Sequence, residues 1–180
     1  IFIILLKEQK KIQTITYKNH TYPLLQSEGN AAQYAVPFAK KVLSNCQTTY
    51  DVGCNRLEWM YPNAIPIDPE IDLRFDAYNF PKTVNKPDSI FSSHCLEHLP
   101  DWVGALNYWH SEMCKNGILF LYLPHADQHY WKPWNNRKHL HSFTPAIIKD
   151  YLIDSGLWKN IFVTEGYDLN HSFYAIAEKL

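Results

Sequence analysis

The residues whose types could carry out chemistry come directly after segments that are predicted to be buried strands. Gly53 comes directly after residues 48–52, and the loop it opens continues through Cys54 and Asn55. A glycine here lets the chain turn tightly and lets a ligand approach the backbone. A plain tight turn explains a single glycine equally well. The loop also lacks the G-x-G-x-x-G pattern of a pyrophosphate cradle, which argues against a dinucleotide site.

A carboxylate follows the next apolar run. Asp68 comes directly after residues 64–67 and lies downstream of Asp51 and the glycine loop. An acidic residue about 20 positions past such a loop can accept hydrogen bonds from the ribose hydroxyls of a nucleotide-like ligand. The alternative is that Asp68 and Pro69 only start a turn. We favour the ribose-binding interpretation.

His94, Glu97 and His98 form the pattern H-x-x-E-H. In some peptidases the two imidazoles of this pattern bind zinc and the glutamate acts as general base. On an α-helix the three side chains would share one face. The motif, however, follows a strand directly, Pro100 leaves little room for a helix, and no third ligand is evident. A zinc-dependent hydrolase is therefore a minor alternative, and we expect no metal site.

Residues 125–141 are rich in histidine and aromatic side chains and follow a strongly apolar run at 118–123. A loop of this length is typically a functional lid or disordered, and its tryptophans favour an ordered lid. Imidazoles can accept a proton near neutral pH, and indoles can face a cation. A structural role stays open for each histidine. We expect substrate-binding residues at His129, Tyr130, Trp131, Trp134 and His139, and catalytic residues at His94, His125 and His141.

The order of the elements predicts an α/β fold with a doubly wound, mostly parallel Rossmann-like sheet. No helix separates the last two strands, so they should form a C-terminal antiparallel hairpin. In such sheets ligands bind beyond the carboxyl ends of the strands. The strands are expected at residues 48–52, 64–67, 73–75, 89–92, 118–123, 160–164 and 172–178, and the helices at 31–43, 102–113 and 146–154.

Residues 1–30 are expected to be a lead-in segment and residues 31–180 a single domain. Asn30 is positioned to cap the first helix, which Pro37 should kink or divide into a second start.

The composition limits the partners. The chain has 180 residues and a formal net charge of −1, so no global basic field favours an extended nucleic-acid surface. The apolar run at residues 1–6 is too short for a secretory signal or a membrane span. The four cysteines form no C-x-x-C pair, which fits free thiols and a cytoplasmic location. The oligomeric state is not predicted.

Several segments resemble, in order, the motifs of the class I S-adenosylmethionine-dependent methyltransferases. The resemblance extends over about residues 48–178. It includes D-V-G-C at the first loop, S-H-C-L-E-H-L after the fourth expected strand, and H-S-F-T-P before the last helix. The matching segments are residues 51–54, 67–70, 76–77, 87–101, 115–124 and 141–156.

The resemblance implies the cofactor S-adenosylmethionine and transfer of its methyl group to an oxygen or nitrogen nucleophile. We expect a small-molecule or glycan-type acceptor. Gly53 and Cys54 would border the methionine moiety, within a loop that also includes Asp51 and Asn55. The ribose would bind Asp68 and the adenine would face Asp76 and Ala77, while the floor near the methyl group would comprise Ser92, Ser93 and His94.

Two features depart from the family pattern. Asn55 replaces the usual second glycine, although asparagine tolerates left-handed backbone angles. The first crossover is also too short for the usual long helix. These departures leave open a protein that binds the cofactor without catalysis, while the missing glycine fingerprint argues against an NAD or nucleotide-sugar enzyme.

Overall fold

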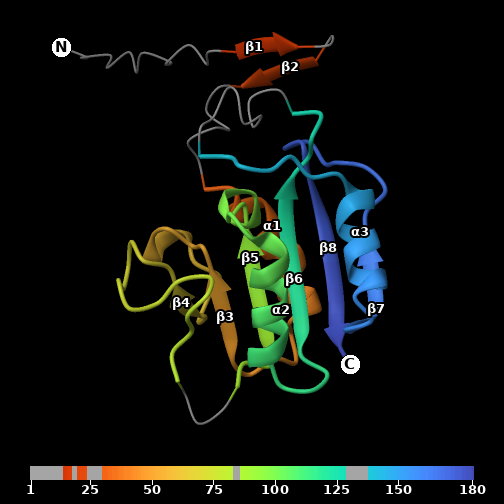
Figure 1. Cartoon of the computed structure of the whole chain (residues 1–180). Helices are drawn as coiled ribbons and strands as arrows, with labels where there is room; N and C mark the ends of the chain where they lie inside the picture. Colours follow the sequence, from red (N-terminus) through yellow and green to blue (C-terminus); the bar gives the residue numbers. More distant parts are fainter. Residues whose placement is uncertain (1–13, 18–19, 24–29, 83–85, 129–137) are drawn as a thin grey trace, which may run out of the picture.

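Six strands form one twisted sheet in the order β4-β3-β5-β6-β8-β7 (Figure 1). The computed structural model describes residues 14–17, 20–23, 30–82, 86–128 and 138–180. The first four strands of the sheet are parallel, and β8 pairs antiparallel with both β6 and β7. The strands are β3 (Thr49–Val52), β4 (Ile65–Ile67), β5 (Ser89–Ser93), β6 (Ile118–Pro124), β7 (Trp158–Val163) and β8 (Ser172–Lys179). The predicted mostly parallel sheet with a C-terminal antiparallel hairpin is confirmed.

Helices cover both faces of this sheet (Figure 1). One face packs against α1 (Ala32–Val42), and the other against α2 (Trp102–Glu112) and α3 (Pro145–Asp154). Because side chains alternate along a strand, β6 contributes to two cores. Its Leu119, Leu121 and Leu123 join the α2 and α3 side, while Phe120 and Tyr122 join the α1 side. This two-sided burial explains why β6 is apolar throughout.

At the starts of α3 and α1 the expected side chains accept backbone hydrogen bonds, although the N-cap position of α1 itself is Ala31. The Thr144 side chain accepts a hydrogen bond from the Ile147 N–H at 3.4 Å, and Pro145 opens α3. Asn30 likewise accepts from the Gln33 N–H at 3.3 Å. The structure has α1 as one helix that contains Pro37, so a second helix start at this proline was wrong.

The predicted strand at residues 73–75 does not form. Turns occupy the segment instead, because its backbone donors bond locally. The Phe75 N–H donates to the Asp72 carbonyl at 3.0 Å, and the Arg74 N–H donates to the Asp72 side chain at 3.0 Å. Leu73 is 91% exposed, so it offers the segment no burial. The sheet therefore ends at β4.

A short hairpin, β1 (Thr14–Tyr17) and β2 (His20–Pro23), lies in the segment expected to be a hairpin or irregular lead-in.

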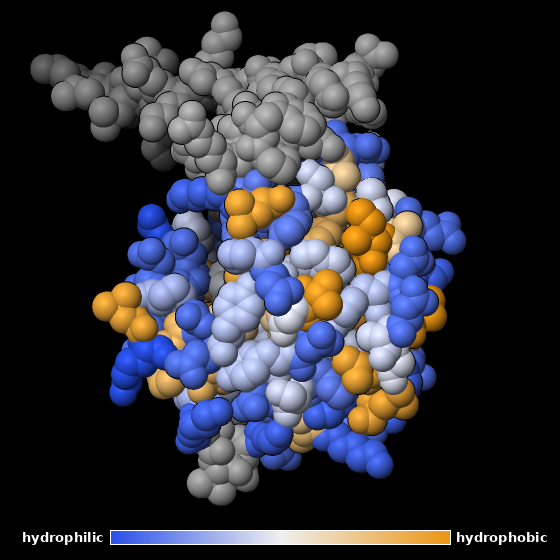
Figure 2. All heavy atoms as spheres, viewed as in Figure 1, coloured by the Kyte–Doolittle hydropathy of each residue, from blue (hydrophilic) through white to orange (hydrophobic). Residues whose placement is uncertain are grey.

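On the face of the sheet that carries α2 and α3, the coloured apolar atoms lie in small groups among hydrophilic ones (Figure 2). Within the described ranges, every helix is too short or too polar to cross a bilayer.

Candidate active site

The loop after β3 turns through two left-handed residues. Gly53 has φ +83° and Asn55 has φ +62°, so Asn55 adopts the left-handed backbone that asparagine was expected to tolerate. A Cβ atom on Gly53 would collide with the Cys95 side chain, so the absence of a side chain allows the two loops to approach. The Gly53 N–H also donates to the Ile67 carbonyl at 3.0 Å, which joins the ends of β3 and β4.

Asp68 fixes the geometry at the end of β4. Its Oδ2 accepts from the Asn55 N–H at 2.8 Å, and its Oδ1 accepts from the Glu70 N–H at 2.9 Å. The side chain is largely buried yet lines the cavity described below. Each carboxylate oxygen can accept more than one hydrogen bond, so Asp68 can organise the loop and still accept from a ligand.

Asp51 and Cys54 lie in the buried wall of the same loop. The Asp51 Oδ2 accepts from the Tyr61 N–H at 2.6 Å. Burial raises the pKa of Asp51 to about 7, and the nearby Asp68 raises it further against the lowering effect of the Tyr61 hydrogen bond. Burial, with the charges of Asp51 and Asp68, raises the pKa of the Cys54 thiol to about 12. Cys54 therefore stays a neutral, unreactive thiol at physiological pH.

Asp76 and Ala77 form the next part of the wall. The Asp76 Oδ1 accepts from the Tyr78 N–H at 2.7 Å. The Ala77 carbonyl accepts from the buried indole N–H of Trp109 at 2.7 Å, which ties this turn to α2. Although the predicted third strand is absent, local turns hold both residues at the cavity.

The three residues at the end of β5 have different surroundings. Ser92 is buried and donates from Oγ to the Val52 carbonyl at 2.8 Å, away from the cavity lining, whereas Ser93 and His94 line the cavity. His94 has φ +51°, and its Nε2 lies 2.8 Å from the Ser172 Oγ. Burial, together with His139 and His98, lowers the pKa of His94 to about 3. It is thus neutral at physiological pH and a weak base.

The H-x-x-E-H residues do not share an α-helix, as the preceding strand and Pro100 indicated. His94 precedes a short 3₁₀ helix, η3 (Leu96–His98), because its left-handed backbone interrupts any continuous α-helix. The three polar side chains of the motif still lie close together, since the Glu97 Oε1 lies 3.8 Å from the His94 Nδ1 and 3.7 Å from the His98 Nε2.

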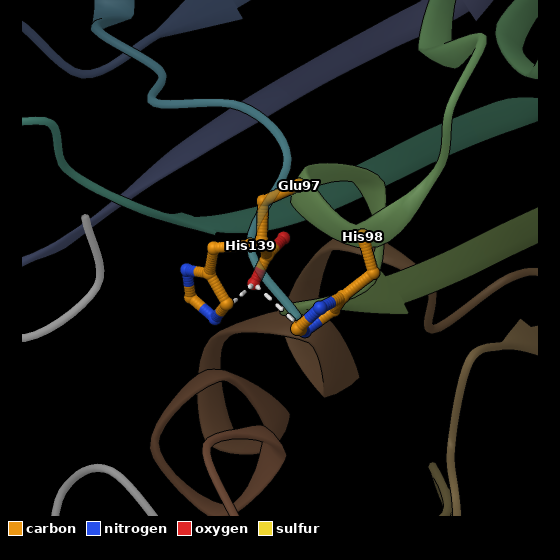
Figure 3. Close-up of side chains that lie close together, drawn as sticks. All are labelled: Glu97, His98 and His139. Carbon is orange, nitrogen blue, oxygen red and sulfur yellow. Dashed lines mark ion pairs between the residues drawn. The ribbon is translucent and has the colours of Figure 1, made fainter. Parts of the chain in front are cut away.

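A third histidine, His139, joins Glu97 and His98 from the segment after β6 (Figure 3). Its Nε2 lies 4.0 Å from the Glu97 Oε1, and its ring meets that of His98 edge to face at 4.5 Å between centroids. Burial raises the pKa of Glu97 to about 8. Sequence reasoning placed His139 at the substrate site but kept Glu97 and His98 only for the zinc alternative. The H-x-x-E-H pattern was the available clue.

Backbone hydrogen bonds hold the His139 segment against η3. The Glu97 carbonyl accepts from the Leu140 N–H at 2.8 Å and from the His141 N–H at 3.2 Å. The His141 ring donates from Nε2 to the Leu99 carbonyl at 2.9 Å, and it does not line the cavity. His139 and His141, although close in sequence, therefore have different surroundings.

The other end of the expected lid is anchored elsewhere. The His125 N–H donates to the His171 carbonyl at 2.8 Å, and the Ala126 N–H donates to the Phe143 carbonyl at 2.6 Å. His125 is absent from the cavity lining. The expected substrate-binding residues between these anchors lie outside the described residues: His129, Tyr130, Trp131 and Trp134.

These loops enclose a cavity of about 570 Å³ beyond the carboxyl ends of β3, β4 and β5. This volume is within the range of small-molecule and cofactor sites. The position agrees with the ligand-binding edge of doubly wound sheets. The expected site residues that line it are Asp51, Gly53, Cys54, Asn55, Asp68, Asp76, Ala77, Ser93, His94 and His139, and they are joined by Glu97 and His98.

Comparisons with known proteins find similarity in structure alone. No family model matches the sequence, and no curated protein matches it. A SAM-dependent methyltransferase from Archaeoglobus fulgidus superposes with a TM-score of 0.57 at 15% identity, covering 82% of this chain and 94% of that one.

Two further solved structures superpose at least as well. The N-methyltransferase NodS from Bradyrhizobium japonicum, in complex with S-adenosylhomocysteine, gives a TM-score of 0.57 at 14% identity, over 87% of this chain and 91% of that one. The 1,6-didemethyltoxoflavin-N1-methyltransferase from Burkholderia thailandensis gives 0.61 at 14% identity, over 86% and 80%. The chain thus has the class I methyltransferase fold that its sequence motifs predict.

Proposed function

We propose that this protein transfers a methyl group from S-adenosylmethionine to an oxygen or nitrogen nucleophile of a small-molecule or glycan-type acceptor. The main support is the cavity at the ends of β3 and β4, where Gly53, Asn55 and Asp68 lie together. In the NodS and toxoflavin methyltransferase structures, proteins of the same fold hold S-adenosylhomocysteine.

The donors and acceptors of the cavity suit this cofactor. Asp68 has carboxylate oxygens at the cavity wall, which can accept from two ribose hydroxyls. Asp51 and Asp76 add further carboxyl groups to the lining. S-adenosylmethionine carries a sulfonium and an ammonium group, and an acidic pocket favours such a cationic ligand.

The chain's own residues would act mainly by positioning. When bound, the cofactor would supply an electrophilic methyl group. The acceptor's lone pair would form the new bond to carbon while the carbon–sulfur electrons stay on sulfur, and the acceptor's proton would pass to solvent. Gly53 and Asn55 would shape the backbone around the methionine moiety, while Ser93 and His94 would bound the floor near the transferred group. Proximity and exclusion of water would then supply most of the rate enhancement.

We assign the acceptor side to the segment 125–141. This assignment is supported by His139, which lines the cavity next to η3. Trp131 and Trp134 would cover the acceptor, so replacing both with alanine should reduce turnover far more than cofactor affinity. His125 and His141 lie outside the cavity lining and would support this segment rather than exchange protons with the acceptor.

Calorimetric titration tests the proposal. S-adenosylhomocysteine should bind one site per chain, whereas NAD should show no saturable binding, because the loop after β3 lacks the phosphate-binding glycines. Tighter binding of NAD than of S-adenosylhomocysteine would overturn the proposed function. A turnover assay against a panel of hydroxyl and amine acceptors then separates an enzyme from a protein that only binds the cofactor.

A further inference from the structure

We propose that Glu97, His98 and His139 bind a divalent transition-metal ion at the wall of the cavity. The three side chains converge on one point: two come from η3 and one from the segment after β6 (Figure 3). Their potential ligand atoms all lie within 4.8 Å of one another.

The buried carboxylate of Glu97 is the main evidence. The side chain is 0% exposed, and neither of its oxygens has a hydrogen-bond partner within the part of the chain that the structure describes. Its Oε1 approaches the His98 and His139 Nε2 atoms only to 3.7 and 4.0 Å, which is beyond hydrogen-bond range. Buried polar groups are normally hydrogen-bonded, and buried charges are paired or bound to metal. A cation between these atoms would give the Glu97 oxygens the partner that they lack.

A hydrogen bond fixes the tautomer of the neutral His98 ring in the form that can bind a metal ion. Its Nδ1 lies 2.7 Å from the Lys138 carbonyl, which can only accept, so Nδ1 carries the hydrogen and donates. In the neutral ring, Nε2 then presents its lone pair toward Glu97. Metal-binding histidines commonly have this arrangement, with the second ring nitrogen held by a backbone carbonyl.

The protein positions both sides of the cluster before any ion binds. Hydrogen bonds from Leu140 and His141 to the Glu97 carbonyl fix the backbone around His139. Ligands bound at about 2.0–2.2 Å in a tetrahedron lie roughly 3.5 Å apart. Binding therefore requires the ligand atoms to move closer by about 1 Å, which small side-chain rotations provide.

The ligand types select the class of metal. Two imidazoles with one carboxylate suit zinc, manganese, iron or cobalt, whereas magnesium and calcium prefer oxygen ligands. Because all three side chains line the cavity, the open coordination positions face it. If the proposed function holds, an acceptor hydroxyl or amine can occupy one of these positions.

This site differs from the zinc alternative that the motif suggested. The motif paired His94 with His98, but the His94 Nε2 lies 2.8 Å from the Ser172 Oγ. His139, which is distant in sequence, takes the place of His94 in the metal-binding group. Glu97 becomes a ligand rather than a general base.

Titration of the full chain after removal of metal by a chelator tests the site. Zn²⁺ and Mn²⁺ are titrated separately by calorimetry without cofactor, and Co²⁺ binding is followed by visible absorption. We expect one ion per chain for at least one of these metals. Glu97→Gln, which keeps the shape of the side chain, should weaken binding by about 100-fold or more, above the range for loss of an outer-shell partner.

Two further variants make the test decisive. His98→Gln should weaken metal binding similarly and serves if Glu97→Gln fails to fold, since His98 is partly exposed. His110→Gln is the matched control, because His110 lies on α2 with its Nε2 3.1 Å from the Leu157 carbonyl. It should leave metal affinity within twofold of the parent value.

The metal site would be overturned if none of the three ions bound stoichiometrically. It would also be overturned if an ion bound and its affinity were unchanged in Glu97→Gln and His98→Gln. Either result would favour a protonated Glu97 instead. The metal titration uses no cofactor and the cofactor titration uses no metal. Failure of one proposal is therefore distinguishable from failure of the other.

Discussion

The two sides of the cavity satisfy their polar groups in different ways. On the β3 and β4 side, Asp68 accepts from two backbone N–H groups and Asp51 accepts from a third. On the η3 side, Glu97 is more deeply buried than Asp68, yet its oxygens lack hydrogen-bond partners among the described residues. The first side obtains its geometry from its own backbone, whereas the second leaves a buried carboxyl group without hydrogen-bond partners among the described residues.

This difference predicts different responses to mutation. Changes on the β3 and β4 side should alter folding and cofactor affinity together, because the same hydrogen bonds serve both. Changes on the η3 side should alter metal affinity without a comparable loss of cofactor affinity. The following substitutions measure how far the two sides are separate.

Gly53→Ala should have the largest effect. A left-handed alanine costs about 1–2 kcal/mol, and overpacking against Cys95 adds about 1–3 kcal/mol. Urea unfolding should therefore show a loss of about 2–5 kcal/mol, together with loss of cofactor binding.

Two other glycines separate these causes. Gly156 has φ +65°, but a Cβ added there would have no neighbour within 4 Å. Gly166 lacks the left-handed backbone angle, and a Cβ added there would also have no neighbour within 4 Å. Gly156→Ala should cost about 1–2 kcal/mol, and Gly166→Ala should change stability by less than about 0.5 kcal/mol. Equal losses in all three variants would show that contact with Cys95 does not set the need for glycine.

Asp51 should make stability depend on pH. Because burial raises the pKa of Asp51 from 3.8 to about 7, the folded state binds this proton more tightly than the unfolded state. The unfolding free energy should therefore fall as pH rises from about 4 to about 7. At about 1.4 kcal/mol per pKa unit, the upper limit is about 4 kcal/mol.

Comparison with Asp51→Asn isolates this residue from other titrating groups. Asparagine keeps an oxygen for the Tyr61 N–H but carries no charge, so the variant should gain stability relative to the parent protein as pH rises. Urea unfolding at pH 4 to 8 measures the difference. A difference that stays constant across this range would contradict the assigned cause.

Asp68→Ala should weaken S-adenosylhomocysteine binding by roughly 5- to 150-fold, because about 1–3 kcal/mol is lost when hydrogen-bond donors are left unpaired. The matched control is Asp72→Asn, which removes an exposed ion pair with Arg74 in the same turn region. This control should keep the affinity within twofold. Unchanged affinity in Asp68→Ala would remove Asp68 from the cofactor site.

Apart from the control variants, His141→Gln should have the smallest effect. Its ring donates to the Leu99 carbonyl, so losing that hydrogen bond should lower stability by about 1 kcal/mol. Cofactor affinity measured by calorimetry should stay within twofold. A large loss of cofactor affinity would mean that His141 contributes to the cavity.

Hydrophobic patterning predicted most of the sheet, because burial forces a regular period onto the sequence. Residues 118–123 were clear as a strand since β6 is buried on both faces. The strand prediction at residues 73–75 was wrong. Apolar and polar side chains alternate there as they do in a strand, but Asp72 accepts hydrogen bonds that favour a turn. Side-chain competition of this kind is hard to recognise from periodicity alone.

Position after a strand predicted which loops line the cavity, because the carboxyl ends of parallel strands share one edge. The cluster of Glu97, His98 and His139 was harder to predict. His139 reaches Glu97 from 42 positions along the chain through backbone contacts that no spacing rule encodes. Ser92 was expected at the cavity but does not line it. Alternate side chains of a strand point to opposite faces, and the Ser92 hydroxyl donates to the Val52 carbonyl.

A crystal structure of the full chain grown with S-adenosylhomocysteine tests the central claim most directly. We predict ligand density in the cavity, with the ribose hydroxyls within hydrogen-bond distance of the Asp68 carboxylate and the homocysteine moiety against Gly53 and Asn55. Ligand bound elsewhere, or a cavity that stays empty at saturating ligand, would contradict the assignment of this edge of the sheet as the cofactor site.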